Sequence, residues 1–578
     1  MPVPVPGPVP LPKLKSVPVP TPVPTLPGCR HNPAMRRPAL AFLSLLLATA
    51  THAQLKPGED ALPAAVLAAL QRTELPADAL AAVALPLSGA AGAFWQRPWG
   101  HQPQRSMQPG SAMKLVTSIV ALDLLGPNLR GSTELRSAAP LLPNGTLQGD
   151  LVLKGGADPE LGVPQFWALL QELRAAGVRT ITGNLIVDRT LWRPARMDLG
   201  LPPFDTAPDF PYNVIPDALQ LAGALLPLRL SSNADTLQAD TVPPLAGLSI
   251  SSRMTLTDGR CAAWDEGWQS ATVKSATVKP TAVEPTAVKP AAVKPAAVEP
   301  AGAAASDGAA ATPASPASPA SHLVIELQGR FPRHCTQRAE LQLIDRQQLT
   351  ERLFATLWQQ LGGQWLGHAV EAAAPADTRL LARRLSRPWG EVLRTLNKTS
   401  DNALTRMLFL NLGVAGMADQ PQASTAELAR RVVLRWLAEH RIDSTGVVMD
   451  NGSGLSRSER ISPWQLARML KVAHSARYAS ELVMSLPVAG VDGTMRNRLK
   501  DSPAAGWARL KTGTLRNVVA LAGYVSDARG QVWAVAMMIN HEQASRGRPV
   551  LDALVDHIAR HGPHALQPTT VGPQGDGP

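Results

Sequence analysis

The chain has 578 residues, of which 45% are apolar and 17% are charged, and its formal net charge at pH 7 is +11. This length is sufficient for several hydrophobic cores and for about two to four domains. Basic residues are scattered, as at Arg383-Arg384 and Arg430-Arg431, and form no runs interleaved with aromatic side chains. The charge therefore favours a solvated face with at most peripheral contact to a membrane or an anionic polymer, and it argues against nucleic-acid binding.

The N-terminal region predicts export. Residues 1–34 alternate proline and valine, a composition that we expect to be disordered. Residues 35–53 resemble a secretion signal: a basic pair follows Met35, an apolar stretch covers residues 39–50, and Ala53 ends a small-residue cleavage site. The apolar stretch is too short to span a bilayer. We expect Met35 to be the translation start and the mature protein to be periplasmic.

The first candidate for chemistry is a Ser-x-x-Lys sequence, Ser111 to Lys114, which opens an apolar helix pattern over residues 111–125. Because positions i and i+3 share a helix face, the Lys114 amine can reach the Ser111 hydroxyl. Backbone donors at a helix N-terminus also favour negative charge beside the serine. Lys114 can act as a base if burial and a neighbouring cation such as Lys511 lower its pKa. The alternative is a serine cap followed by a solvated lysine.

A second polar motif, Ser400-Asp401-Asn402, lies between two helix patterns at residues 389–397 and 403–412. Its position is compatible with a functional role. The alternative is an ordinary helix junction at which these side chains cap the helix ends.

The third motif, Lys511-Thr512-Gly513, precedes two apolar strand patterns at residues 518–526 and 532–540, which a Gly-containing turn separates. We expect antiparallel strands here. A glycine on such a strand lets a substrate backbone approach closely. The alternative is an unremarkable glycine at a strand end.

The three motifs in this order are the signature of enzymes that form an acyl-serine with a penicillin or a D-alanyl peptide. The chain resembles the peptidase S13 family of low-molecular-mass penicillin-binding proteins, the D-alanyl-D-alanine carboxypeptidases and endopeptidases of the penicillin-binding protein 4 type. The resemblance runs from about residue 55 to about residue 565. Further matching segments are residues 149–159, 181–188, 211–213, 450–457 and 485–494.

The resemblance implies an α/β (α+β) fold, the β-lactamase/transpeptidase-like domain of penicillin-recognising serine enzymes, with an antiparallel sheet flanked by helices. Nearly three hundred residues separate Ser111 from Ser400, so an inserted module must lie between them. The expected organisation is a disordered extension (1–34), a signal peptide (35–53), the transpeptidase-like domain in two parts (55–125 and 340–566), a large, mainly β insert between them (126–339), and a disordered tail (567–578).

Within the insert, residues 271–321 contain a repeat of the Ala-Val-Lys/Glu-Pro type and an Ala/Ser/Pro tract, which predict a semi-extended linker. Cys261 and Cys335 flank this segment. An oxidising compartment favours a disulfide between them, and free buried thiols are the alternative. No spacing typical of a metal site and no Gly-rich phosphate loop occurs, so we expect neither a metal nor a cofactor.

The resemblance also implies the roles of the site residues. Ser111 attacks the substrate carbonyl, Lys114 accepts its proton, and Ser400 delivers a proton to the departing D-alanine. Asp205 and Arg457 bind the free end of a diaminopimelate side chain. The implied substrate-binding residues are Asn402, Lys511, Thr512, Gly513, Thr514, Arg457 and Asp205.

The expected partners are peptidoglycan peptides as substrates and β-lactams as covalent inhibitors. Two other functions compete with this interpretation. A serine β-lactamase needs a base for fast deacylation, and the chain contains no Glu-x-x-Leu-Asn pattern. A non-catalytic peptidoglycan-binding protein could keep the fold and lose the chemistry, but all three motifs are intact.

Overall fold

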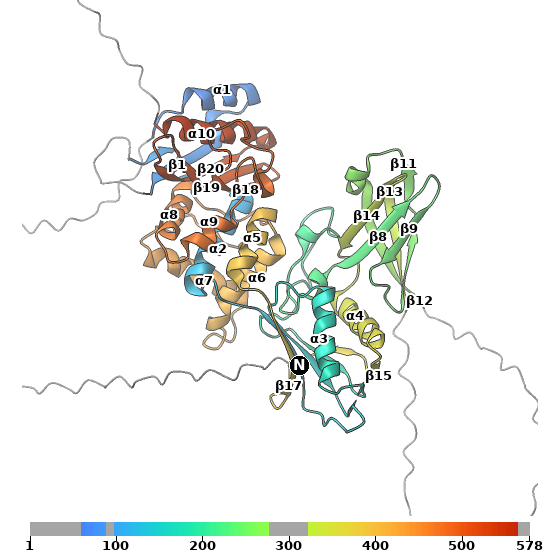
Figure 1. Ribbon diagram of the computed structural model, residues 1–578. Coiled ribbons are helices and arrows are strands. Elements are labelled where there is room, and N and C mark those ends of the chain that lie inside the picture. Colours follow the sequence, from blue (N-terminus) through green and yellow to red (C-terminus); the bar gives the residue numbers. More distant parts are fainter. Residues whose placement is uncertain (1–58, 88–96, 277–321, 565–578) are drawn as a thin grey trace, which may run out of the picture. The chain divides into compact units, whose positions relative to one another are not determined.

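The computed structural model describes residues 59–87, 97–276 and 322–564 (Figure 1). Within these ranges, no helix is both long and apolar enough to cross a membrane. Several expected segments lie wholly or mostly outside the described residues, namely the extension at 1–34, the signal peptide at 35–53, the linker at 271–321 and the tail at 567–578.

A five-stranded antiparallel sheet carries the third motif, and its strand order is β18-β19-β20-β1-β2. Successive side chains of a strand point to opposite faces of its sheet. Along the first strand, Val83 therefore joins one hydrophobic core and its neighbour Ala82 joins another. The strands are β1 (Leu80–Pro86), β2 (Trp99–His101), β18 (Arg509–Leu515), β19 (Val518–Ser526) and β20 (Val532–Asn540).

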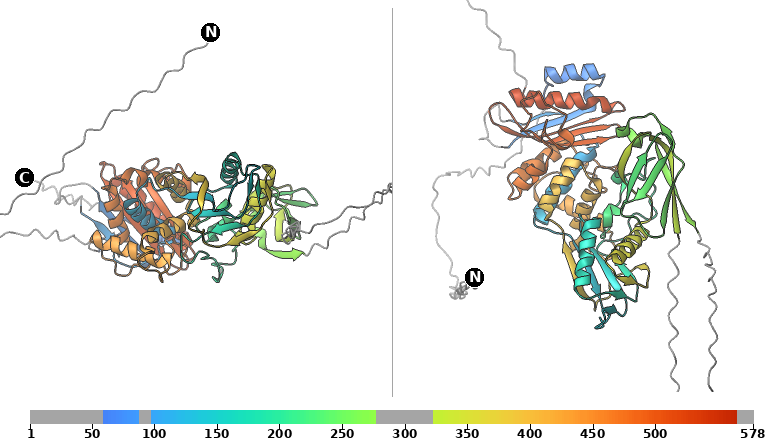
Figure 2. Two further views of the ribbon diagram at one scale, coloured as in Figure 1. Left: turned by 90° about the horizontal axis from the view of Figure 1, so that it is seen from below. Right: turned by 45° about the vertical axis from the view of Figure 1, so that its right-hand side comes forward.

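Helices cover both faces of this sheet. The first and last described helices pack together on one face, where α1 is blue and α10 is red in the right-hand view of Figure 2. The helices that carry the first two motifs lie in the core of the opposite face. The helices are α1 (Ala64–Thr73) and α10 (Arg548–His561) on one face, and α2 (Lys114–Leu124), α5 (Trp389–Thr399), α6 (Asn402–Gly413), α7 (Thr425–Glu439), α8 (Pro463–His474) and α9 (Ala479–Ser485) on the other.

A mixed five-stranded sheet, in the order β16-β7-β5-β3-β17, belongs to the inserted region. It shares one core with two helices and with a small parallel sheet of order β15-β6-β4. The elements are β3 (Ser132–Ser137), β4 (Thr146–Leu147), β5 (Leu151–Gly156), α3 (Val163–Ala175), β6 (Thr180–Ile181), β7 (Leu185–Asp188), α4 (Arg346–Gln360), β15 (Gln364–Trp365), β16 (Ala369–Glu371) and β17 (Arg379–Leu385).

The other described strands of the inserted region form two further sheets. One antiparallel sheet has the order β14-β8-β9, and the long strand β13 pairs with β10, β11 and β12. The strands are β8 (Leu226–Ser232), β9 (Leu237–Thr241), β10 (Leu248–Ser252), β11 (Thr255–Thr257), β12 (Trp268–Ala276), β13 (His322–Pro332) and β14 (Thr336–Leu341).

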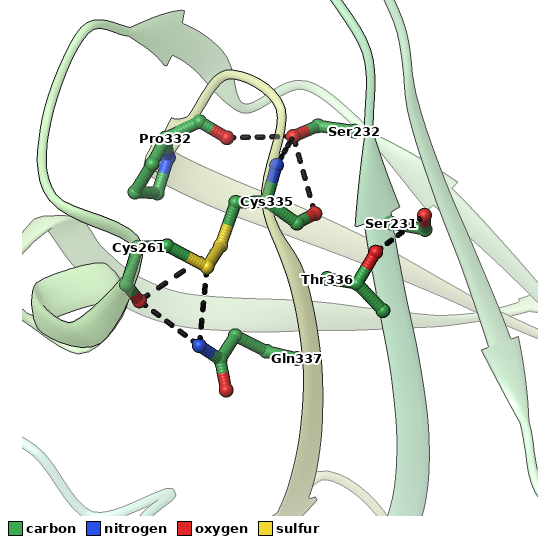
Figure 3. Close-up of a disulfide and its surroundings, with 7 residues drawn as sticks. All are labelled: Ser231, Ser232, Cys261, Pro332, Cys335, Thr336 and Gln337. Carbon is green, nitrogen blue, oxygen red and sulfur yellow. Dashed lines mark hydrogen bonds between the residues drawn. A yellow bond between two sulfur atoms is a disulfide. The ribbon is translucent and has the colours of Figure 1, made fainter.

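A disulfide joins Cys261 to Cys335 across these strands, 74 positions apart in sequence (Figure 3). Polar contacts surround it: the Gln337 side chain donates to the Cys261 carbonyl at 3.0 Å, and the Cys335 amide donates to the Ser232 hydroxyl at 3.1 Å. The bridge therefore connects the short helical turn before β12 to the start of β14. It ties the two sides of the low-complexity segment to one folded module.

Two boundaries differ from those expected. The segment 271–321 was expected to be a linker, but its first residues pair with β13, from Thr272 opposite Glu326 to Ala276 opposite His322. The helix α4 and the strands β15–β17 were expected in the second catalytic part. They instead pack in the core of the inserted region, and β17 pairs with β3. We therefore propose that the second catalytic part begins near Trp389, and that α3 and α4 make the insert less purely β than expected.

We predict that residues 277–321 can be replaced by a two-residue Asn-Gly turn without loss of stability. Ala276 and His322 lie opposite each other in antiparallel strands, so a hairpin turn can join them. Shortening a loop reduces the entropic cost of bringing its ends together, by roughly 0.6 kcal/mol for each halving of its length. The melting temperature should therefore stay the same or rise slightly.

The matched control extends the same deletion back to residue 272, which removes the paired residues of β12. This control should melt at a lower temperature. If the shorter deletion were equally destabilised, residues 277–321 would contribute to the folded core, and the expectation that they form a linker would be incorrect.

Candidate active site

Ser111 lies in a single 3₁₀ turn, Gly110–Met113, and α2 begins directly after it at Lys114. The helix pattern thus starts three residues later than expected, but the i, i+3 geometry is retained. The distance from Lys114 Nζ to Ser111 Oγ is 3.2 Å. Ser111 is half-buried, whereas Lys114 is fully buried. The lysine is therefore a part of the core and not a solvated helix charge.

Three oxygen atoms surround the Lys114 amine, and one of them is Ser111 Oγ. Nζ donates to Asn402 Oδ1 at 2.6 Å and to the backbone carbonyl of Ser453. A neutral amine has two N–H bonds and one lone pair. When Lys114 is neutral, the Asn402 and Ser453 oxygens can take its two N–H bonds, which leaves the lone pair for the Ser111 hydroxyl. This geometry suits a base that accepts the serine proton.

Electrostatics favour the same state. Burial is the main cause that lowers the pKa of Lys114 to about 7, and the Arg406 guanidinium lowers it further, while Asp401 and Glu459 act in the opposite direction. Burial and the neighbouring Lys114 hold the pKa of Lys511 well below its usual value. Lys114 can therefore lose its proton near neutral pH.

The second motif occupies the junction between α5 and α6, as its pattern predicts. Ser400 ends α5 with a left-handed φ of 62°, and Asp401 caps α6 by accepting from the Leu404 amide at 2.8 Å. The turn between the two helices presents its other side chains to the site. Ser400 Oγ accepts from Lys511 Nζ at 2.8 Å, and Asn402 Nδ2 donates to the Tyr212 carbonyl at 2.9 Å.

The third motif lies on β18, which packs directly against the turn of Ser111. A Cβ on Gly513 would lie 2.2 Å from the Pro109 carbonyl oxygen, so only glycine fits there. Gly110 has a φ of +50°, and a Cβ on it would lie 3.0 Å from the Thr514 amide nitrogen. Gly513 was expected to let a substrate backbone approach closely. In this structure it lets the turn that carries Ser111, Gly110–Met113, pack against β18, and this places the Thr514 amide beside that turn. We call Gly110–Met113 the nucleophile turn, after the role proposed for Ser111.

A buried carboxylate, which the sequence pattern does not reveal, organises the loop on the other side of Lys114. Glu459 accepts from the amides of Asp450 and Asn451 at 3.1 Å each, from Gly452 at 2.7 Å and from Gly454 at 2.8 Å. These hydrogen bonds hold the loop in place. The Ser453 carbonyl, which belongs to the same loop, accepts a hydrogen bond from Lys114 Nζ. Burial raises the pKa of Glu459, although the amides of Asp450, Gly452 and Gly454 oppose the shift. The Gly-rich stretch before it is the only sequence signal of a tight turn.

The remaining expected residues lie beside the site. The Arg457 guanidinium stacks 5.2 Å from the Phe204 ring centre, in the wall of a cavity of about 580 Å³. Asp205 accepts from the Tyr212 hydroxyl at 2.7 Å and from the Asn213 side chain at 3.1 Å. These hydrogen bonds and Arg457 outweigh partial burial and lower the pKa of Asp205.

Of the β18 threonines, Thr512 is half-buried and its hydroxyl lies 2.8 Å from that of Thr494, and Thr514 is exposed. Among the residues that the structure describes, no group of three or more His, Cys, Asp or Glu side chains could hold a metal ion.

Ser111 lies within hydrogen-bond distance of a buried lysine whose pKa is lowered to about 7, an arrangement that can activate a serine without a histidine. Together with the second Ser–Lys pair and an antiparallel sheet covered by helices on both faces, it defines a penicillin-recognising serine hydrolase. The expected fold class is confirmed.

Comparisons with known proteins agree. The sequence model of the D-Ala-D-Ala carboxypeptidase 3 (S13) family matches residues 62–561, so the chain belongs to this family. The chain is 26% identical over 466 residues to a D-alanyl-D-alanine carboxypeptidase of Actinomadura sp. (strain R39), which covers 79% of this chain and 77% of that protein. It is 24% identical over 438 residues to the D-alanyl-D-alanine carboxypeptidase DacB of Haemophilus influenzae, which covers 75% of this chain and 80% of that protein.

A solved structure supports the fold. Penicillin binding protein 4 (dacB) from Haemophilus influenzae superimposes with a TM-score of 0.63 at 20% identity, covering 86% of this chain and 99% of that chain. The protein is a penicillin-binding serine peptidase of the D-Ala-D-Ala carboxypeptidase type, and the expected family and general function are confirmed. Neither the β-lactamase nor the non-catalytic alternative is favoured.

We predict that acylation by a β-lactam rises with pH, reaches half of its maximum rate constant near pH 7 and levels off above about pH 8. The base must be neutral, and Lys114 has a pKa of about 7 in the folded protein. Below that value the neutral fraction, and with it the second-order rate constant, should fall about tenfold for each pH unit. Stopped-flow measurement with a fluorescent penicillin gives this profile. A rate constant that does not change across this range would exclude Lys114 as the titrating base.

Proposed function

We propose that the protein cleaves the D-alanyl-D-alanine bond of peptidoglycan peptides through an acyl-enzyme on Ser111. The arrangement at Lys114 supports this most directly. Two oxygen acceptors take its N–H bonds, and its Nζ lies 3.2 Å from Ser111 Oγ. β-Lactams would acylate the same serine and act as covalent inhibitors.

Ser111 Oγ attacks the carbonyl carbon of the scissile bond while its proton moves to Lys114 Nζ. The amides of Ser111 and Thr514 stabilise the oxyanion, and one donor of this kind lowers the barrier by roughly 3 kcal/mol. Ser400 gives its hydroxyl proton to the nitrogen of the departing D-alanine and regains a proton from Lys511 Nζ, 2.8 Å away. In deacylation a water oxygen bonds to the acyl carbon as one water proton passes to Lys511, and Lys114 returns its proton to Ser111 Oγ as the ester bond breaks and the shortened peptide leaves.

The substrate's terminal carboxylate would bind to Lys511, Thr512 and Thr514. The pKa of Lys511 is lowered in the free protein. The negative charge of the bound substrate carboxylate would favour the protonated form of Lys511. Asn402 would hydrogen-bond the acyl chain. Gly513 keeps β18 against the nucleophile turn, so that an extended substrate lies beside both.

The cavity lined by Arg457 would receive the side chain of the substrate's third residue. Arg457 and Asp205 would bind the charged groups at the free end of a diaminopimelate side chain. Their opposite charges suit the carboxylate and the ammonium of that group. In the free protein, Asp205 is held by Tyr212 and Asn213 and is therefore already oriented.

We also propose endopeptidase activity and export to the periplasm. Cleavage of a cross-link and removal of a terminal D-alanine release different amines. Both reactions pass through the same acyl-enzyme. Room beside the site in the cavity of about 580 Å³ supports a branched substrate. The expected signal at residues 35–53 and the Cys261–Cys335 bridge fit an oxidising compartment.

We predict that Ser111→Ala abolishes both peptide cleavage and penicillin labelling while the protein remains folded. The substitution removes the nucleophile, and the Ser111 hydroxyl caps neither the 3₁₀ turn nor α2, so the fold should be retained. Purified sacculi treated with each protein should show the difference, with free D-alanine and separated cross-linked dimers as the two products measured by mass spectrometry.

Ser106→Ala is the matched control, because Ser106 is an exposed serine near the site whose hydroxyl donates to the Gly446 carbonyl. It should keep wild-type activity. Labelling of Ser111→Ala at the wild-type rate would mean that another serine is the nucleophile. Release of D-alanine without dimer cleavage would reject only the endopeptidase proposal.

A further inference from the structure

A short segment of the inserted region reaches the active site through its main chain. In this segment, residues 212–217, the Tyr212 carbonyl accepts from Asn402 Nδ2 at 2.9 Å, and the Val214 carbonyl accepts from Arg406 Nη1 at 3.1 Å. Both partners lie on α6. We call residues 212–217 the anchor segment.

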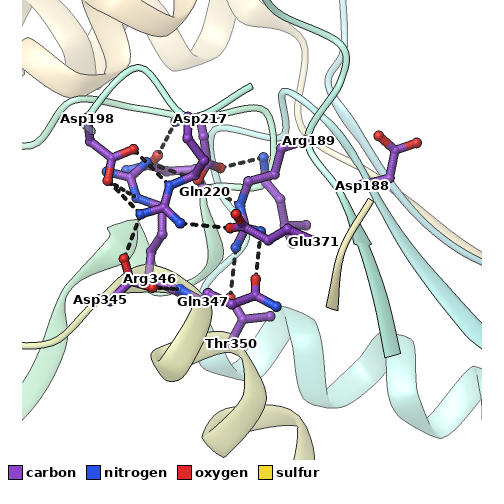
Figure 4. Close-up of polar contacts among 12 residues, drawn as sticks. Asp188, Arg189, Asp198, Asp217, Gln220, Asp345, Arg346, Gln347, Thr350 and Glu371 are labelled. Atoms are coloured by element: carbon purple, nitrogen blue, oxygen red, sulfur yellow. Dashed lines mark hydrogen bonds and ion pairs between the residues drawn. The ribbon is translucent and has the colours of Figure 1, made fainter. Parts of the chain in front are cut away.

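The other end of the anchor segment is held by a buried ion cluster of the inserted region (Figure 4). Arg346, the first residue of α4, donates to the Ile215 carbonyl at 2.8 Å and to Asp217 Oδ2 at 2.9 Å. The same carboxylate oxygen accepts from Arg189 Nε at 2.9 Å. Asp217 and Arg189 are 1% and 2% exposed, so solvent does not replace these contacts.

The anchor segment decides which end of the Asn402 amide faces the catalytic lysine. An amide side chain offers a carbonyl acceptor at one end and N–H donors at the other. Because Nδ2 donates to the Tyr212 carbonyl, Oδ1 is turned toward Lys114 Nζ, which it meets at 2.6 Å. A reversed amide would place two donors against the lysine N–H bonds and would compete for its lone pair.

We propose that Arg346 and Asp217 are positioning residues for acylation, acting through the anchor segment on the orientation of Asn402 and hence of the Lys114 amine. This inference rests on the proposed roles of Ser111 and Lys114. It assigns the inserted region a part in the chemistry. The competing explanation is that the cluster only stabilises the inserted region and leaves the site unaffected.

The test is the variant Arg346→Lys, which keeps a positive charge but lacks the planar fork that reaches Ile215 and Asp217 together. We expect the plateau rate constant for penicillin acylation to fall about tenfold, since small displacements of reacting groups reduce rates by such factors. The midpoint of its pH profile should move to lower pH, because losing the Asn402 acceptor favours neutral Lys114. Rates are expressed per active site, counted by exhaustive labelling, so that unfolded protein does not contribute.

The matched control is Arg384→Lys. Arg384 pairs with the buried carboxylate of Asp158 at 2.9 Å in the same region, and none of its described hydrogen bonds reaches the anchor segment. The control should lose stability without changing the acylation plateau or midpoint. The charged groups that act on Lys114 are present in both variants; they are Asp401, Glu459 and Arg406.

A plateau and midpoint equal to wild type in folded Arg346→Lys would overturn the proposal. If this variant does not fold, Asp198→Asn serves instead, because it weakens only the 3.3 Å contact to Arg346 Nε and the pair with Arg196. Its plateau should fall about threefold, and an unchanged plateau would again overturn the proposal. Failure of wild-type protein to label at Ser111 would instead reject the proposed function itself.

Discussion

The active site depends on the burial of two lysine amines next to each other. Lys114 and Lys511 are both fully buried, and burial lowers the pKa of each, to about 7 for Lys114. Neutral oxygen acceptors surround them: an amide oxygen and a carbonyl for Lys114, a hydroxyl and a carbonyl for Lys511. A carboxylate in direct contact with Lys114 would raise its pKa and would make Lys114 unsuitable for the proposed role of base.

Close backbone packing makes this burial possible. The nucleophile turn lies between β18 and the loop that Glu459 organises, and a glycine lies at each of these two close backbone contacts. A Cβ on Gly513 would meet the Pro109 carbonyl, and one on Gly454 would lie 2.0 Å from the Gly110 carbonyl oxygen. These contacts join three segments that are far apart in sequence into one rigid site. The anchor segment of the inserted region adds a fourth.

The local parts of the site follow from sequence, because short-range geometry decides them. The spacing of Ser111 and Lys114 predicts their contact, and the junction between two helix patterns predicts how Ser400 is presented. The long-range parts do not follow. Nothing near Arg379–Leu385 indicates that β17 pairs with β3, and the pattern around Glu459 is that of any polar loop. Likewise, the contact between Asn402 and the Tyr212 carbonyl is set by tertiary packing across nearly two hundred residues.

The most direct test of this account is the titration of Lys114 itself. Protein labelled with ¹³C at lysine Cε carries one NMR signal per lysine, and the Lys114 signal is assigned by its absence in Lys114→Arg. The account predicts a titration midpoint of about 7 for this signal. A midpoint near the ordinary lysine value of about 10.4 would mean that Lys114 is charged at neutral pH, and it would contradict the assignment of this residue as the base.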